Sequence, residues 1–221
     1  MKYLLNFTLI LVLLATSCSE SKLGDFQEVY EVEMVGIWSS ATHPTDFPSN
    51  AHFSRMIGLS HIAALDVVGV GLSATTGIKS MAETGETRTL EAEFDKFRTQ
   101  TYSADKMMGS SFDSPGSNKS QIGVERGRHN VTVFSMIAPS PDWFVAASTS
   151  LIDPTDDEWY DEVIVYATSY DAGTDSGLSF VSPDQVSSPV EGVRIIETDP
   201  LVEGMDTVKN IAKFIFRRLS K

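Results

Sequence analysis

The sequence predicts an all-β fold, an antiparallel β-sandwich with one short helix and long loops. Residues 28–38 give the clearest strand, because Glu31 and Glu33 alternate with apolar neighbours at the period of two that a half-buried strand shows. Other short segments are apolar and rich in β-branched residues, as interior strands are. The further predicted strands are 61–72, 129–137, 162–167, 178–182, 193–198 and 210–219. Strands 162–167 and 178–182 are expected to form a hairpin.

One helix is expected over residues 86–98, because Leu90, Phe94 and Phe97 fall on one helical face. Residues 103–120 contain Gly, Ser, Pro and Asn with little periodicity. That composition predicts a long surface loop.

The first residues read as an export signal. Residues 1–17 combine a cationic start with an apolar core over 4–14, which is too short to span a bilayer as a helix. The small residues before Cys18 resemble the lipobox at which bacterial signal peptidase cuts, so this cysteine is expected to carry lipid. The alternative is an ordinary signal peptide with an incidental cysteine. Residues 18–25 then form a short polar tether, and one sandwich domain follows over 26–221.

Cys18 is the only cysteine of the chain, which excludes an intrachain disulfide. Several acyl chains on an N-terminal cysteine are expected to hold the domain at a bacterial membrane. Ser19 after the cysteine favours the outer membrane if the source has two membranes. The domain is therefore expected to face the periplasm or the cell surface.

The chain is strongly acidic. Its net charge is −13, and removal of residues 1–17, which contain one charged residue, Lys2, gives −13 − 1 = −14. Such a surface repels nucleic acid and anionic lipid headgroups, which argues against both as direct partners.

Three carboxylates stand in segments built as loops. Asp142 lies in PSPDWF at 139–144, and Asp171 and Asp175 lie in YDAGTDSG at 170–177. Hard oxygen donors from two loops suit Ca²⁺ better than Zn²⁺ or copper, so the sequence predicts a calcium site. The spacing is not that of an EF-hand loop. Turn formation by aspartate and glycine is the alternative explanation for any one of these residues.

Prolines and glycines make these segments loops. Pro139 and Pro141 each fix φ and lack a backbone donor, so the run before Asp142 cannot continue a central strand. Gly173 and Gly177 permit positive φ, which lets the second loop fold back around an ion.

The two motifs, in this order and on either side of a segment containing Trp159, resemble the spondin N-terminal domain family, the F-spondin and mindin type. Other parts of the chain agree, and the resemblance covers most of residues 26–219. The agreeing segments are 35–61, 76–94, 182–183 and 210–219. The resemblance implies a C2-like antiparallel β-sandwich with one Ca²⁺ held between loops at one end.

The resemblance also implies a set of ligands, completed by water. The implied ligands are the side chains of Asp142, Asp171 and Asp175 and the backbone carbonyl of Ala172. Mindin-type domains add a glutamate from a strand upstream of a histidine. Glu125 is the nearest glutamate here, although its offset from His129 differs by one residue from the family spacing.

Other chemistries are less well supported. His43, His52 and His61 follow one another at intervals of nine residues, whereas structural zinc ligands usually lie two to five residues apart, so a packing or hydrogen-bonding role is expected for them. No G-x-S-x-G motif marks a serine nucleophile, and no pair of carboxylates is singled out for glycoside hydrolysis. Trp143 and Phe144 are expected to pack in the core beneath the ion.

The residues and the resemblance together predict a calcium-binding recognition or adhesion module on a bacterial membrane, without enzymatic activity. Its expected partner is a protein or a glycan, because animal spondin domains serve extracellular-matrix and cell-surface recognition. The alternative is a periplasmic or surface hydrolase that uses the same ion for electrostatic catalysis. It is disfavoured because no general base or nucleophile accompanies the aspartates.

Overall fold

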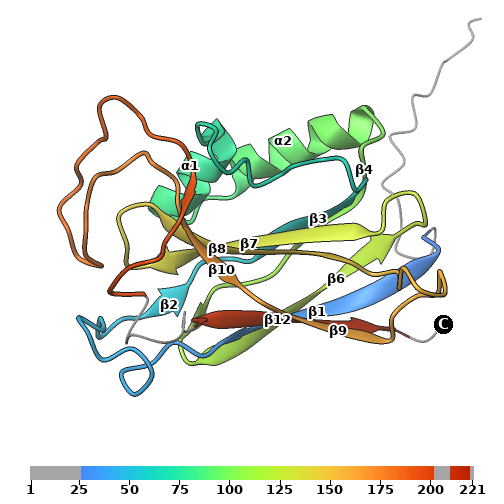
Figure 1. Ribbon diagram of the computed structural model, residues 1–221, viewed down its shortest axis with the longest axis horizontal. Coiled ribbons are helices and arrows are strands. Elements are labelled where there is room, and N and C mark those ends of the chain that lie inside the picture. The colour runs from blue at the N-terminus through green and yellow to red at the C-terminus, as the bar shows by residue number, and fades with distance from the viewer. Residues whose placement is uncertain (1–25, 202–209, 220–221) are drawn as a thin grey trace, which may run out of the picture.

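The computed structural model describes residues 26–201 and 210–219 of the 221-residue chain (Figure 1). The predicted signal peptide, the lipidated Cys18 and the tether lie outside the described residues. Within the described ranges, no helix is both long and apolar enough to cross a membrane.

The fold is a two-sheet antiparallel β-sandwich, as the sequence predicts, with two helices over the outer face of one sheet (Figure 1). The first sheet has four strands in the order β6-β1-β12-β9. These strands are β1 (Glu28–Gly36), β6 (Gly116–Val124), β9 (Glu162–Tyr166) and β12 (Ala212–Arg218).

The second sheet is larger and runs in the order β11-β10-β8-β7-β2-β5, while β3 pairs with β7 and carries β4 on its other side. Its strands are β2 (His52–Phe53), β3 (Ile57–His61), β4 (Ser103–Met108), β5 (Phe112–Asp113), β7 (Asn130–Ala138), β8 (Trp143–Ser150), β10 (Thr168–Asp171) and β11 (Arg194–Ile195). The helices are α1 (Thr76–Thr84) and α2 (Arg88–Thr99).

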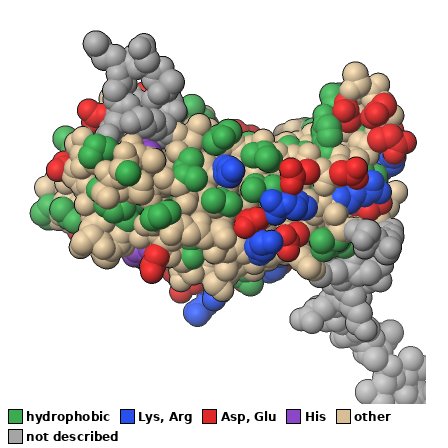
Figure 2. Space-filling model, turned by 90° about the horizontal axis from the view of Figure 1, so that it is seen from below, with side chains coloured by type: hydrophobic (Ala, Val, Ile, Leu, Met, Phe, Trp, Pro, Cys, Tyr) green, Lys and Arg blue, Asp and Glu red, His purple; other side chains and the backbone are tan. Residues whose placement is uncertain are grey.

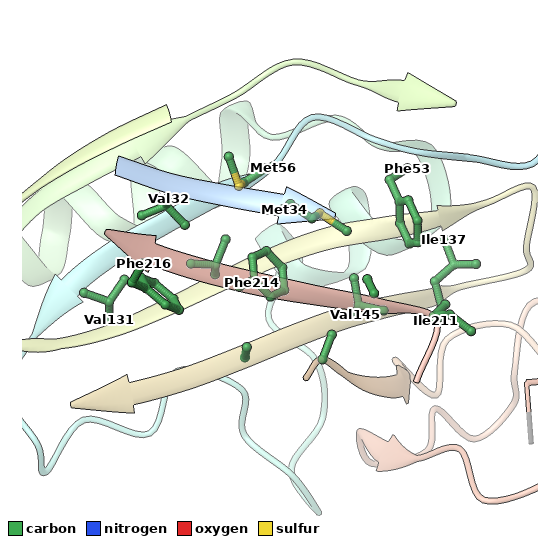
Figure 3. Packing of buried hydrophobic residues seen from close by; sticks show 14 of the residues in the cluster. Val32, Met34, Phe53, Met56, Val131, Ile137, Val145, Ile211, Phe214 and Phe216 are labelled. Carbon is green, nitrogen blue, oxygen red and sulfur yellow. The ribbon is translucent and has the colours of Figure 1, made fainter. Parts of the chain in front are cut away.

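The core between the two sheets is built from alternating residues. Val32 and Met34 of β1 and Phe214 and Phe216 of β12 are fully buried and belong to one apolar cluster with Val131 of β7 (Figure 3). Every second residue of β1 is buried from its third residue onward. This confirms the period of two on which the first predicted strand rests.

A second core lies between the larger sheet and the helices. Ile78 and Met81 of α1 and Leu90 and Phe94 of α2 pack in one cluster with Phe134 of β7. Because β7 is covered by the other sheet on one face and by helices on the other, nearly all of it is buried. A strand covered on both faces is expected to be mostly apolar, and among the buried residues of β7 only Thr132 and Ser135 are polar.

The helix predicted over 86–98 is confirmed as α2, but the expectation of a single helix is wrong. The second helix, α1, begins after Thr75, whose hydroxyl accepts a hydrogen bond from the amide of Ile78 at 3.1 Å. It ends at Gly85, which has φ of 72° and donates to the carbonyl of Met81. A threonine N-cap and a left-handed glycine C-cap are the usual boundaries of a helix, so the signal was present in the sequence.

The long loop predicted over 103–120 is also wrong, because this range contains β4, β5 and half of β6. The first part of β6 shows no apolar alternation, because it contains the polar residues Asn118, Lys119 and Ser120. Its residues are exposed or partly exposed up to Gln121, and its first buried side chain is Ile122. Pairing with β1 from Glu28 to Gly36 makes this polar segment a strand. Tertiary pairing here overrides local preference.

Two predicted strands are absent. Residues 61–72 contain only the last residue of β3, and the chain then turns through Gly69 and Gly71, with φ of 70° and 83°. Residues 178–182 form a turn in which Ser182 Oγ accepts hydrogen bonds from two backbone amides, so the predicted hairpin is wrong. The segment that leads into the acidic loop is β10, which pairs with β8 and β11.

Candidate metal centre

The two segments that carry the three predicted aspartates meet at one end of the sandwich, where β8 begins and β10 ends, near the loops on the left of Figure 1. Asp171 pairs in register with Trp143, the residue that follows Asp142. The backbone amide of Ala172 donates to the carbonyl of Asp142 at 3.1 Å, and the amide of Asp175 donates to its carboxylate at 3.0 Å. The sheet register and the loop bonds thus join two segments that are distant in the sequence.

Asp142 is the buried centre of this arrangement, with no exposed surface. Its Oδ2 atom accepts three hydrogen bonds, from the amide of Thr174 at 2.7 Å, the hydroxyl of Thr174 at 3.1 Å and the amide of Asp175. Its Oδ1 atom is buried and has no hydrogen-bond partner. Burial, with a contribution from the negative charge of Asp171, raises the pKa of Asp142 to about 6, although the three hydrogen bonds act in the opposite direction.

Asp171 is also buried, at 5% exposure, but both of its oxygens are engaged. Oδ1 accepts from the amide of Gly173 at 2.7 Å, and Oδ2 accepts from Nη2 of Arg194 at 2.8 Å. Arg194 therefore neutralises one of the two neighbouring carboxylates.

Asp175 holds the loop that follows it. Its Oδ1 accepts from the amide of Gly177 at 2.7 Å and its Oδ2 from the amide of Gln185 at 2.8 Å. Asp171 and Asp175 each bond the amide two residues further on, which is the turn chemistry that the sequence offers as the alternative explanation. These turns also fix where the two carboxylates lie.

Gly173 is required by the backbone. Its φ is 73°, and a Cβ atom would lie 2.6 Å from the carbonyl oxygen of Glu191. The amide of Glu191 donates back to the carbonyl of Gly173 at 2.9 Å. Only glycine allows this close crossing of two loop segments.

The aromatic residues after Asp142 anchor the site in both cores, as expected. Trp143 packs between the sheets, edge-on against Phe180 at 5.5 Å between ring centroids. Phe144 points to the helix side and stacks on Tyr170 at 5.2 Å. Consecutive residues of β8 thus hold Asp142 in place from two directions.

Glu125 does not belong to the site, so its inclusion as a possible ligand is corrected. It follows β6 directly and forms an ion pair with Arg128, next to the start of β7, whereas Asp142 lies beyond the end of β7. The nine residues of β7 separate the two positions, a length of roughly 30 Å. The spacing between Glu125 and His129 could not show this distance. His129 lies just before β7 and Asp142 lies beyond its end, so the two positions are at opposite ends of the sandwich.

The histidines take part in local hydrogen bonds. His61 is buried, with Nδ1 2.8 Å from the carbonyl of Ile62 and Nε2 2.8 Å from the hydroxyl of Thr132. Nδ1 of His52 lies 2.7 Å from the carbonyl oxygen of Asn50. These contacts agree with the expected hydrogen-bonding role.

Across residues 26–201 and 210–219, no three His, Cys, Asp or Glu side chains are gathered as a ligand set for a metal ion. The carboxylate oxygens of Asp142 and Asp171 are donors of the kind that a hard cation such as Ca²⁺ prefers. The buried Oδ1 of Asp142 is the atom that lacks a partner. Calcium at this position stays a prediction.

Sequence reasoning missed three parts of the arrangement: Thr174, Gln185 and Arg194. Thr174 lies inside the predicted motif, but its role as a double donor to Asp142 depends on the fold of the loop. Arg194 lies in a predicted strand, and only the register of β10 with β11 places it opposite Asp171.

Comparison with known proteins agrees with the fold and the motifs. The family model described as Spondin_N matches residues 28–203. Spondin-1 of Gallus gallus is 29% identical over 207 residues, which cover 87% of this chain and 25% of spondin-1, and spondin-1 of Homo sapiens is 28% identical with the same coverage. Spondin-2 of Homo sapiens is 30% identical over 175 residues, which cover 74% of this chain and 51% of spondin-2. The chain thus spans about a quarter of spondin-1 and about half of spondin-2. The match over most of its length confirms the resemblance: the chain belongs to the spondin N-terminal domain family.

Proposed function

We propose that this chain is a calcium-binding recognition or adhesion module that acts outside the cytoplasm, with the ion bound among the loops around Asp142. The observation that carries the proposal is the buried, unpartnered Oδ1 of Asp142 beside the second buried carboxylate of Asp171. A buried polar atom without a hydrogen-bond partner destabilises the fold, and a buried carboxylate close to a second carboxylate destabilises it further. A divalent cation would satisfy the free oxygen and neutralise the charge of Asp142, which has no cationic partner among the described residues, whereas Asp171 is already paired with Arg194.

The ligands follow from the available lone pairs. Oδ1 of Asp142 has both of its lone pairs free, whereas each oxygen of Asp171 and Asp175 accepts one hydrogen bond and keeps a second lone pair. Together with the carbonyl of Ala172 and water, these oxygens would supply the six to eight ligands that Ca²⁺ takes. Extracellular calcium modules bind with dissociation constants of about 10⁻⁴–10⁻³ M, so such a site fills outside a cell.

The proposed recognition face is the loop surface around the site. Leu178, Val181 and Val186 are 81%, 75% and 67% exposed, and they come from the segment that Asp175 ties together. In Figure 2, acidic and basic side chains mix over the right half of the molecule, while the left end, where these loops lie, is mostly apolar or uncharged. Exposed aliphatic side chains in one region are typical of a surface that binds protein. We therefore favour a protein over a glycan as the partner.

The first described residues lie at the end of the sandwich opposite the loops. Gln27 accepts a hydrogen bond from the amide of Arg126, close to Glu125 and the start of β7. If Cys18 carries lipid, as the sequence predicts, the chain that leads to the anchor would leave the domain at this end.

The proposal is tested by thermal unfolding of the chelator-stripped chain with Ca²⁺ or Mg²⁺. Calcium at ten times its dissociation constant should stabilise the fold by about 1.4 kcal/mol, which raises the melting temperature by several degrees. Asp142→Asn should lose this rise. The matched control is Asp157→Asn, which removes one carboxylate at an exposed position beside Arg126 and should keep the rise.

A second assay addresses the hydrolase alternative. The chain should show no turnover on ester, glycoside and phosphodiester substrates with calcium present. Turnover that Asp171→Asn abolishes would reverse the assignment in favour of a calcium-dependent hydrolase.

A further inference from the structure

Arg194 links the candidate site to a carboxylate outside it. Its Nη2 donates to Oδ2 of Asp171 at 2.8 Å, and its Nη1 forms an ion pair with Glu191. Arg194 stands directly opposite Asp171 in the pairing of β11 with β10, so its backbone is fixed beside the site. The guanidinium group therefore bridges a buried and an exposed carboxylate.

The two carboxylates differ in their surroundings. The side chain of Asp171 is 6% exposed, whereas those of Glu191 and Arg194 are 55% and 51% exposed. The guanidinium can turn about the side-chain bonds of Arg194 without a change of the backbone, because half of this side chain lies in solvent. Glu191, three residues earlier, remains as a partner when the contact with Asp171 is broken.

We propose that Arg194 is a built-in competitor for the divalent cation, a residue that weakens calcium binding and sets the concentration at which the site fills. This inference rests on the proposed calcium site. In the metal-free chain the guanidinium neutralises Asp171. An ion bound at Oδ2 of Asp171 would lie against the guanidinium, so the two cations compete for this oxygen and the guanidinium is expected to stay with Glu191 when calcium binds.

The contact between Arg194 and Asp171 supports this assignment. Nη2 of Arg194 holds Oδ2 of Asp171 at 2.8 Å, so the guanidinium occupies a position beside an oxygen that the ion would use. A unit positive charge about 5 Å from a divalent ion lowers its affinity roughly tenfold even at the dielectric constant of water. The effect is larger where the site is desolvated and smaller where salt screens it.

Calorimetric titration of the chelator-stripped chain with CaCl₂ tests the proposal through three variants. Arg194→Gln should bind calcium about tenfold more tightly than the wild type. Arg194→Lys keeps the charge and should stay within about threefold of the wild type. Arg126→Gln removes an exposed, carboxylate-paired arginine at the far end of the sandwich and should leave the affinity unchanged.

Thermal unfolding gives an independent readout on the same variants. Arg194→Gln should melt below the wild type without calcium, because buried Asp171 loses its counter-ion, and its calcium-induced rise should be larger. Unchanged or weaker calcium binding by Arg194→Gln would overturn the proposal and make Arg194 a residue that orients Asp171. A wild-type chain that binds no calcium at millimolar concentration would instead overturn the proposed function itself.

A measurement on the wild-type chain keeps the inference testable if Arg194→Gln does not fold. The Nε–H resonance of Arg194, identified by its loss in Arg194→Lys, should shift on calcium saturation and exchange faster with water. A resonance that stays in place while calcium saturates the site would also overturn the proposal.

Discussion

Thr174 donates two hydrogen bonds to a single carboxylate oxygen of Asp142, from its amide at 2.7 Å and from its hydroxyl at 3.1 Å. With the amide of Asp175, three donors hold Oδ2 while Oδ1 has none. The carboxylate is therefore fixed in orientation but only half satisfied. This asymmetry gives Oδ1 a fixed direction, which is what a preorganised ligand atom needs.

Two substitutions of Asp142 distinguish the roles of its two carboxylate oxygens. Asp142→Asn keeps one carbonyl oxygen for the three donors, so the metal-free fold should stay cooperative while calcium-induced stabilisation disappears. Asp142→Ala removes the acceptor of all three donors and should lower the free energy of unfolding by about 3 kcal/mol. Chemical denaturation with and without calcium measures both effects. Equal loss of metal-free stability in the two variants would contradict the separate roles of the oxygens.

The stability of the metal-free chain should depend on the protonation of Asp142. Its pKa is raised from 3.8 to about 6, so between these values the folded chain holds a proton that the unfolded chain has released. The free energy of unfolding should therefore fall as pH rises from about 4 to about 6, by at most ~3 kcal/mol from this group, and then level off. The difference between the wild type and Asp142→Asn in urea titrations isolates this contribution. The same pH dependence in both would exclude it.

Calcium should restore part of the stability that the metal-free chain loses as pH rises. A carboxylate ligand must be ionised, so the affinity for calcium should rise through the same pH range. Calorimetric titrations at pH 5 and pH 7 check this, and tighter binding at pH 5 would be inconsistent with coordination by Asp142.

Phe180 should control the order of the loop that carries Asp175. It is 2% exposed and packs against Trp143 and Trp38 at centroid distances of 5.5 and 4.9 Å. Phe180→Ala should cost about 3–5 kcal/mol and weaken calcium binding, because the ion must then order the loop. Leu178→Ala, at an 81% exposed neighbouring position, should change stability by no more than about 0.5 kcal/mol. Similar losses in both variants would refute the anchoring role.

Substitutions of Asp175 and Glu125 should differ in their effect on the calcium-induced rise in melting temperature. Asp175→Ala should abolish the calcium-induced rise in melting temperature and cost the metal-free fold about 1–3 kcal/mol, because the amides of Gly177 and Gln185 lose their acceptor. Glu125→Gln should leave the calcium response intact, since Glu125 is paired with Arg128 at the other end. Differential scanning fluorimetry with and without calcium compares the two. A calcium response in Asp175→Ala equal to that of the wild type would remove Asp175 from the ligand set.

The architecture could be predicted where a segment carries its own signal. Strand β1 and helix α2 could be predicted from the sequence, because each shows one periodic pattern of apolar residues. The polar strand β6 could not, since it is stabilised by pairing with β1 and not by its own composition. The segment 178–182 has strand-like residues, yet it forms a turn around one buried side chain, Phe180.

The candidate site shows the same division. Asp142, Asp171 and Asp175 were found from loop chemistry and from the family motif, both of which lie in the local sequence. The partner of Asp171 was not, because Arg194 is brought there by the register of two short strands. Glu125 was misplaced for the converse reason, since proximity in the sequence to His129 says nothing about which end of a strand faces the site.

The most direct test is a crystal structure of the chain saturated with calcium, with the ion identified by anomalous scattering. One ion should lie at about 2.3–2.6 Å from Oδ1 of Asp142, with oxygens of Asp171 within the same shell. An Oδ1 atom that contacts only water or protein in such crystals would contradict the coordination of calcium by Asp142.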